Sequence, residues 1–417
     1  MTPAVAPAHA GPVTESERAD VLDALRAFAL LGILVSHVPD FTGYNFLPDA
    51  QRALLDPLGI DPAVAGTLVF LIREKFVSLF SFLFGIGFAI QLDRSARRGT
   101  DFRLRFGRRL AALFVIGLAH AALWYGDILK DYAVLGLALF FTWSWPVRRI
   151  AMASVVLLAA RLAWPLLVYF VATASGLSHG GAAPDQAFAD GVAGLAQGPA
   201  AFLRENLQLV GLKALQMIYE GRFITILTMF FIGALAGRIG LFRDLRAHRR
   251  LLVAVMVIGG SIGALANLAL VPFEASRNAY PPTLDWVTFQ SLVAIAAPAL
   301  SLAYASTFAL AWSALDGRVL RGIAPVGRTA LTSYVSQTLL CTIAFTWLGL
   351  GRGLGALGCL TAAILIFAVQ CALAQAWLRR FRFGPLEWIW RCATYGEIIG
   401  IRRPVRLAPE LPTAVAR

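Results

Sequence analysis

Long runs of apolar positions, separated by short loops that carry arginine, dominate this chain. Several of these runs reach 18 residues or more, the length at which a helix can cross the hydrocarbon core of a bilayer. The pattern predicts an all-α, polytopic integral membrane protein. It predicts about ten transmembrane helices, at residues 21–39, 74–92, 109–126, 128–145, 150–172, 222–240, 250–271, 286–313, 326–349 and 355–378.

The composition excludes an ordinary soluble domain. Hydrophobic residues make up 58% of the 417 positions and charged residues only 15%, whereas soluble domains are nearer one quarter charged. The net charge of +13 sits in the loops between apolar runs. The positive-inside rule accounts for that distribution, so we expect no nucleic-acid partner.

The arginines also predict the orientation. Residues 93–109 hold seven arginines, and every second loop after them is basic, while the alternating loops hold few cations. Ten spans with both termini in the cytoplasm satisfy this alternation. The chain then divides into a disordered cytoplasmic tail at 1–17, a single transmembrane domain at 18–396 and a second cytoplasmic tail at 397–417. Residues 173–205 form an outer loop, followed by an amphipathic stretch suited to the membrane interface.

The first predicted span carries three polar residues. Arg26 and His37 are eleven positions apart, which places them within about 20° on one helical face and roughly 16 Å apart along the axis. Asp23 precedes Arg26 by three residues and shares that face. Charges inside a membrane are expensive and usually functional. We predict Arg26 and Asp23 as donor-binding residues and His37 as catalytic; a local Asp23–Arg26 pair with a structural histidine is the alternative.

The third predicted span repeats this arrangement. His120, Trp124 and Asp127 lie at i, i+4 and i+7, on one face if the helix continues through Gly126. His120 is then at a depth comparable to His37, and we predict it as a second catalytic residue. Two histidines suit proton transfer or a metal. No third ligand has a recognisable spacing, so we expect neither a metal nor a tightly bound cofactor.

Further polar residues are candidates for an acceptor site near the outer face. Cations at helix N-termini oppose the helix dipole, and neighbouring glutamates are their simplest explanation. Ser333 and Gln337 share a face one turn apart and fit either interhelical hydrogen bonds or substrate contact. Arg161 lacks a recognisable partner. The predicted acceptor-binding residues are Lys75, Arg222, Glu220, Asp127, Ser333 and Gln337.

Several phrases resemble one family over nearly the whole chain, about residues 18–396. The sequence is similar to the YeiB-like membrane proteins, known as domain of unknown function 418 (DUF418). The phrases are "LDALRAFALLGILVSH", "KFVSLFSFLFGIGFA", "HAALWYGDILKDYAVLG", "GRTALTSYVSQ" and "GPLEWIWR".

A more distant resemblance implies a function. The spacing from Arg26 to His37 resembles the membrane acyltransferase-3 and heparan glucosaminide acetyltransferase proteins, except that Ala27 replaces their usual glycine. That resemblance implies acyl transfer, by way of the histidine, from cytosolic acyl-CoA to a hydroxyl or amine at the outer face. The acceptor would be an envelope glycan, a lipid or an exported small molecule.

The expected location is the bacterial cytoplasmic (inner) membrane, with the lipid bilayer, the acyl-CoA co-substrate and the acceptor as partners. Oligomerisation stays open. The alternative function is a transporter or flippase for a polar or anionic small molecule, whose pathway the same charges would line. The sequence offers neither a clear two-fold repeat nor an unwound helix pair in its favour.

Overall fold

The computed structural model describes residues 20–176, 188, 190–192, 194–195, 197–315 and 320–403. Within them the all-α prediction is confirmed, since the only β pairing is one isolated bridge between Phe381 and Arg402. The predicted tail at 1–17 lies outside the described residues, as does most of the second tail. The helices are α1 (Asp20–Phe41), η2 (Tyr44–Phe46), α2 (Asp49–Leu54), α3 (Asp61–Leu71), α4 (Lys75–Arg97), α5 (Phe102–Ala121), α6 (Leu129–Phe141), α7 (Val147–Ala174), α9 (Pro199–Tyr219), α10 (Arg222–Arg238), α11 (Arg249–Ala254), η3 (Val255–Gly259), α12 (Gly260–Leu270), η4 (Val271–Ser276), α13 (Leu284–Ala314), η5 (Leu320–Gly322), α14 (Ala324–Arg328), α15 (Ala330–Cys341), η6 (Thr342–Trp347), α16 (Ala356–Arg380) and α17 (Pro385–Tyr395).

The helices are those of a multi-pass membrane protein. Six helical stretches of the described chain are long and apolar enough to cross a membrane, and a bent pair makes up to seven. The six are Asp20–Phe41, Asp61–Arg97, Val147–Ala174, Arg249–Ser276, Leu284–Ala314 and Ala356–Arg380. The count of ten spans and the cytoplasmic position of both termini therefore stay predictions.

Three predicted spans do not contain a helix that is long and apolar enough to cross a membrane, each for a physical reason. At 109–126, α5 ends at Ala121 and opens with arginines. At 128–145, α6 has only 13 residues, so it is about 20 Å long, against about 30 Å of hydrocarbon. The stretch 326–349 is divided at Thr329 between α14 and α15 and ends in a π-helical turn.

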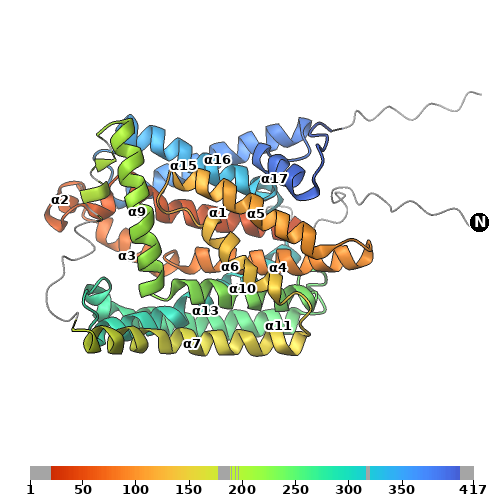
Figure 1. Cartoon of the computed structure of the whole chain (residues 1–417). Coiled ribbons are helices and arrows are strands. Elements are labelled where there is room, and N and C mark those ends of the chain that lie inside the picture. Colours follow the sequence, from red (N-terminus) through yellow and green to blue (C-terminus); the bar gives the residue numbers. More distant parts are fainter. Residues whose placement is uncertain are drawn as a thin grey trace, which may run out of the picture.

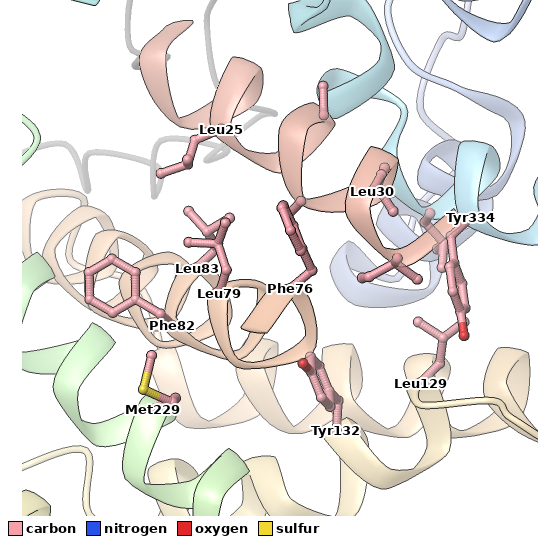
Figure 2. Packing of buried hydrophobic residues seen from close by; sticks show 14 of the residues in the cluster. Leu25, Leu30, Phe76, Leu79, Phe82, Leu83, Leu129, Tyr132, Met229 and Tyr334 are labelled. Carbon is pink, nitrogen blue, oxygen red and sulfur yellow. The ribbon is translucent and has the colours of Figure 1, made fainter. Parts of the chain in front are cut away.

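The core of the molecule lies where α1 meets α4. Leu25 and Leu30 of α1 are fully buried, as is Leu79 of α4, and Figure 2 shows Phe76 of α4 between Leu79 and Leu30. Gly32 makes this approach feasible, because a Cβ atom there would overlap the Phe76 ring. The first span is thus surrounded by protein, whereas α7 is mostly exposed at one edge of the bundle (Figure 1).

Two glycines set the contact between α4 and α10. A Cβ atom on Gly85 would overlap the backbone carbonyl oxygen of Phe230, and one on Gly233 would overlap that of Phe82. The two contacts are reciprocal, since each glycine meets the carbonyl three residues before the other. Small residues allow such close approach between membrane helices, and here they let the backbones of α4 and α10 meet.

Helix α9 does not continue the direction of α10. The two helices meet at an angle of 70° across a short break at Gly221, and Figure 1 shows α9 crossing one end of the bundle. Its surface is inverted relative to a soluble helix, because Leu207 and Leu215 face outward and Asn206 is buried. That arrangement agrees with the predicted interfacial stretch, whose depth in a membrane stays a prediction.

Cysteine labelling tests the orientation. Thr100 lies in the turn between α4 and α5, within the most basic loop, so we expect Thr100→Cys to be protected from an impermeant maleimide in intact cells. Leu203→Cys on α9, whose native side chain is exposed, should be labelled. Both are made without the four native cysteines, and the reverse labelling pattern would contradict the predicted orientation.

Candidate functional site

A buried histidine–carboxylate pair lies at the end of α5. The Nδ1 atom of His120 is 2.7 Å from Oδ1 of Asp127, and its Nε2 atom is 2.9 Å from the hydroxyl oxygen of Thr338 on α15. The side chains of His120 and Asp127 are 1% and 0% exposed. Against an ionised Asp127, which only accepts hydrogen bonds, Nδ1 would donate, and in the neutral imidazole Nε2 would then accept from the Thr338 hydroxyl. Both ring nitrogens are therefore occupied.

The helix does not continue through Gly126, so that prediction is wrong. The chain turns after Ala121, and the backbone N–H of Asp127 donates to the carbonyl of Trp124. Gly126 is needed there because a Cβ atom would overlap the Trp124 indole. The second oxygen of Asp127 accepts from the backbone N–H of Lys130 at the start of α6. A turn, rather than a shared helical face, brings Asp127 to His120.

His37 lies beside this pair but is chemically different. Its ring centre is 5.7 Å from that of Trp124, which itself stacks on Phe41 at 3.9 Å. Among the residues that the structure describes, neither ring nitrogen of His37 has a hydrogen-bond partner. Its side chain is half-buried, and it interacts electrostatically with Lys213 and His120. Of the two predicted histidines, His37 is therefore the one whose ring nitrogens are not engaged within the described residues.

The inner face of α9 carries three polar residues that sequence reasoning missed, Asn206, Lys213 and Gln216, and leads to Glu220, which was predicted. The side-chain amide of Asn206 donates to the carbonyl of Ala121 at 2.7 Å, which ties α9 to the end of α5. Further along this face, Lys213 donates to Gln216 at 3.0 Å, and Gln216 donates to Glu220 at 2.7 Å. These polar residues are separated by seven, three and four positions, which places them on one helical face. That spacing was the available signal for a face directed at the site.

Arg222 and Lys75, predicted together at an outer rim, have separate partners. The guanidinium of Arg222 is 2.9 Å from Glu74 and 3.9 Å from Glu220. Glu74 has a φ of 64°, an unfavourable conformation for a residue other than glycine. The ammonium of Lys75 instead donates to the side chain of Asn267 at 2.7 Å. The two glutamates thus neutralise Arg222, which is the simpler explanation given for a cation at a helix N-terminus. Lys75 instead contacts a neutral side chain of α12.

The donor-binding candidates lie at the opposite end of α1. The guanidinium of Arg26 is 2.5 Å from the carboxylate of Asp23, so the predicted local pair exists. Arg26 also interacts electrostatically with Arg109, whose guanidinium stacks 3.6 Å from the ring centre of Trp390. Burial lowers the pKa of Arg391 on α17 below its ordinary value, and Asp23 acts in the opposite direction. This cluster of arginines favours a bound anion.

Ser333 and Gln337 serve interhelical contacts. The amide of Gln337 donates to Gln370 of α16 at 2.8 Å, and Gln370 donates to the carbonyl of Ser333 at 3.0 Å. The buried Arg161 also has partners, since it donates to Thr225 at 3.0 Å and to Gln290 at 3.4 Å. Substrate contact by Ser333 or Gln337 stays a prediction. Within the described residues, no group of three or more metal-ligating side chains is present.

Comparison with known proteins places these residues in a family. Residues 236–397 match the family model described as "Protein of unknown function (DUF418)". The chain is 32% identical to the "Uncharacterized protein YeiB" of Escherichia coli, over 91% of this chain and 96% of that protein. It belongs to the DUF418 family.

Two Bacillus relatives extend the match. The "Uncharacterized protein YxaH" of Bacillus subtilis is 31% identical over 92% of this chain and 96% of its own length. An "Uncharacterized 39.9 kDa protein in amylase 3'region" of Bacillus acidopullulyticus is 26% identical over 93% and 96%. No solved structure matches. The predicted membership of DUF418 is confirmed, and the family brings no activity with it.

Proposed function

We propose that this protein is a membrane-embedded acyltransferase of the inner membrane, which moves an acyl group from cytosolic acyl-CoA to a hydroxyl or amine at the outer face. The observation that carries the proposal is His37, a half-buried histidine without a hydrogen-bond partner in the described chain, beside the buried His120–Asp127 pair. Such a histidine suits a general base. The ten-span topology with both termini inside belongs to the same proposal.

The chemistry divides between the two histidines. His37 takes the proton of the acceptor hydroxyl or amine while the acceptor's oxygen or nitrogen attacks the thioester carbonyl. The new bond forms as the C–S bond breaks, and the proton passes from His37 to the departing thiolate of coenzyme A. His120 is held by Asp127 and Thr338, so it acts as a positioning residue that supports the developing charge. The acyl-transfer step itself needs no tightly bound cofactor.

The charges at the two ends of the molecule support the direction of transfer. Arg26, Arg109 and Arg391 cluster at one end of α1, and phosphates of a nucleotide-bearing thioester would complement them. At the other end, Lys213 of α9 and Arg222 of α10 interact electrostatically with His37, and Glu220, which follows α9, lies 3.9 Å from Arg222; together they make a polar surface. That surface suits a glycan, a lipid headgroup or a small polar acceptor.

The experiment is a turnover assay on purified protein reconstituted in vesicles. Acetyl-CoA is supplied on the arginine-rich side, together with an extract of envelope glycans and lipids. Free coenzyme A and newly acylated products are measured by mass spectrometry. Release of coenzyme A that depends on the extract would support the proposal, and its complete absence with acetyl and longer acyl donors would end it.

Transport is the second candidate, and one observation favours it. The 70° bend between α9 and α10 and the π-helical turns at 255–259 and 342–347 are interruptions of the kind that line transport pathways. Transport predicts that an unmodified polar solute crosses reconstituted vesicles without any acyl-CoA. Acyl transfer predicts no such movement.

Donor binding should depend on the shape of the Arg26 side chain. In Arg26→Lys the charge facing Asp23 is kept, but the planar fork that recognises phosphate in a bidentate manner is lost. We expect acetyl-CoA affinity to fall about tenfold, the size of one charge-assisted hydrogen bond. Calorimetric titration measures it. Arg249→Lys, at the exposed start of α11, is the matched control, and equal affinity in the two variants would contradict the role of Arg26.

A further inference from the structure

A groove of about 270 Å³ opens between α3, α4, α12 and α13, and it holds neither His37 nor His120. Its walls are largely apolar, and charged residues gather where α3 gives way to α4. The apolar lining includes Val69 and Phe70 of α3, Leu270 of α12, and Phe289 and Val293 of α13. The polar end consists of Arg73, Glu74, Lys75, Asn267 and Glu274.

Lys75 places a buried positive charge at the polar end of this groove. Its side chain is buried, with the residue 4% exposed. The Nζ atom donates to the carbonyl of Val69 at 3.0 Å and to Oδ1 of Asn267 at 2.7 Å. Both acceptors are neutral, and an ammonium has three N–H donors. A buried cation with only neutral hydrogen-bond partners is costly.

The neighbouring carboxylates are engaged elsewhere. Glu74 forms its ion pair with Arg222 at 2.9 Å, and Glu274 forms one with Arg73 at 2.6 Å. In the described part of the chain, Lys75 has no carboxylate within ion-pair distance. One positive charge and one N–H therefore remain available at the polar end of the groove.

The surroundings of the groove identify the class of ligand. Val271, which lines it, is 69% exposed, and Leu268 beside it on α12 is 59% exposed. In a multi-pass membrane protein, such apolar exposure faces lipid. A ligand that reaches Lys75 from this side must carry an apolar chain and an oxyanion, which describes an anionic membrane lipid.

We propose that this groove binds one anionic phospholipid, with an acyl chain along α3 and α13 and the phosphate on the Lys75 ammonium. The site is separate from the acyl-transfer centre and does not depend on it. Phosphatidylglycerol is the probe, because it carries a phosphate and no balancing cation. Phosphatidylcholine carries the same phosphate but adds a cation near Arg73, and like-charge repulsion should make it bind about tenfold more weakly.

Two glycines provide a matched test by native mass spectrometry of the purified full chain. Gly66 lines the groove, and Gly87 of α4 does not. A Cβ atom at either position would meet nothing within 4 Å. Gly66→Leu fills the groove without strain and should abolish retention of one phosphatidylglycerol molecule. Gly87→Leu should retain it, and equal retention in the two variants would overturn the proposal.

A second variant tests the anchor. Lys75→Gln keeps a hydrogen-bond donor but removes the charge, and phosphatidylglycerol affinity should fall about tenfold or more. Unchanged phosphatidylglycerol affinity would remove Lys75 from the site. Inorganic phosphate alone, added in excess, should not displace the lipid; displacement would show that the site recognises free phosphate instead.

Discussion

Replacing His37 by glutamine is expected to lower acyl-CoA turnover by about 10²–10⁴-fold, the usual cost of removing a general base. Glutamine can make hydrogen bonds but cannot take up a proton at neutral pH. Because His37 has no hydrogen-bond partner in the described chain, the substitution breaks no buried network. We therefore expect His37→Gln to insert, to fold and to bind acetyl-CoA as the native protein does.

The measurement is release of coenzyme A in reconstituted vesicles, with donor affinity measured in parallel. His248→Gln is the control, because His248 lies in the loop before α11, where its Nδ1 atom is 2.9 Å from the carbonyl oxygen of Asp244. The control should keep full turnover. A His37→Gln variant with near-native turnover would assign His37 to structure or to a transport pathway.

Helical spacing was sufficient to predict the polar stripe of the first span. Arg26 and His37 belong to one continuous helix, α1, so their spacing of eleven residues determines their relation without reference to any other part of the fold. Asp23 pairs with Arg26 for the same reason. Within a single helix, periodicity determines which side chains share a face.

The relation of His120 to Asp127 could not be derived in that way. The seven-residue spacing indicated a shared face, but the helix ends at Ala121 and a turn returns Asp127 to His120. Thr338 completes the arrangement from α15, more than two hundred positions away. Contacts between helices depend on packing, which apolar periodicity does not specify.

The span count shows a second limit of hydropathy. Apolar runs at 128–145 and 326–349 satisfied the sequence criterion, yet they contain a short helix and a helix with breaks. Conversely, α9 was noted only as amphipathic, although it carries Lys213 toward His37. Hydropathy measures transfer into lipid and not the helix breaks that tertiary structure introduces.

The same substitution should have opposite effects at two glycines of α4. Gly85→Ala places a Cβ atom against the carbonyl oxygen of Phe230 and near the backbone nitrogen of Ala234. Backbone atoms cannot rotate away, so α4 and α10 must separate. We expect a loss of about 3 kcal/mol or more in the free energy of unfolding, the upper end for an overpacked core.

Gly87→Ala is the matched control, two residues along the same helix. A Cβ atom there meets nothing within 4 Å, and alanine restricts the unfolded chain more than glycine does. We expect it to stabilise the protein by about 0.4–1 kcal/mol. Gly233→Ala, which meets the carbonyl oxygen of Phe82, should behave as Gly85→Ala does.

Thermal unfolding of the purified variants in one detergent, followed by size-exclusion chromatography, gives the order of stabilities. The glycine contact holds α10, and with it Arg222 against Glu74, at the His37 end of α1. Separation of α4 from α10 should therefore reduce turnover as well as stability. If Gly85→Ala proved as stable as Gly87→Ala, the close crossing of α4 and α10 would be wrong, and so would the position of Arg222 near His37.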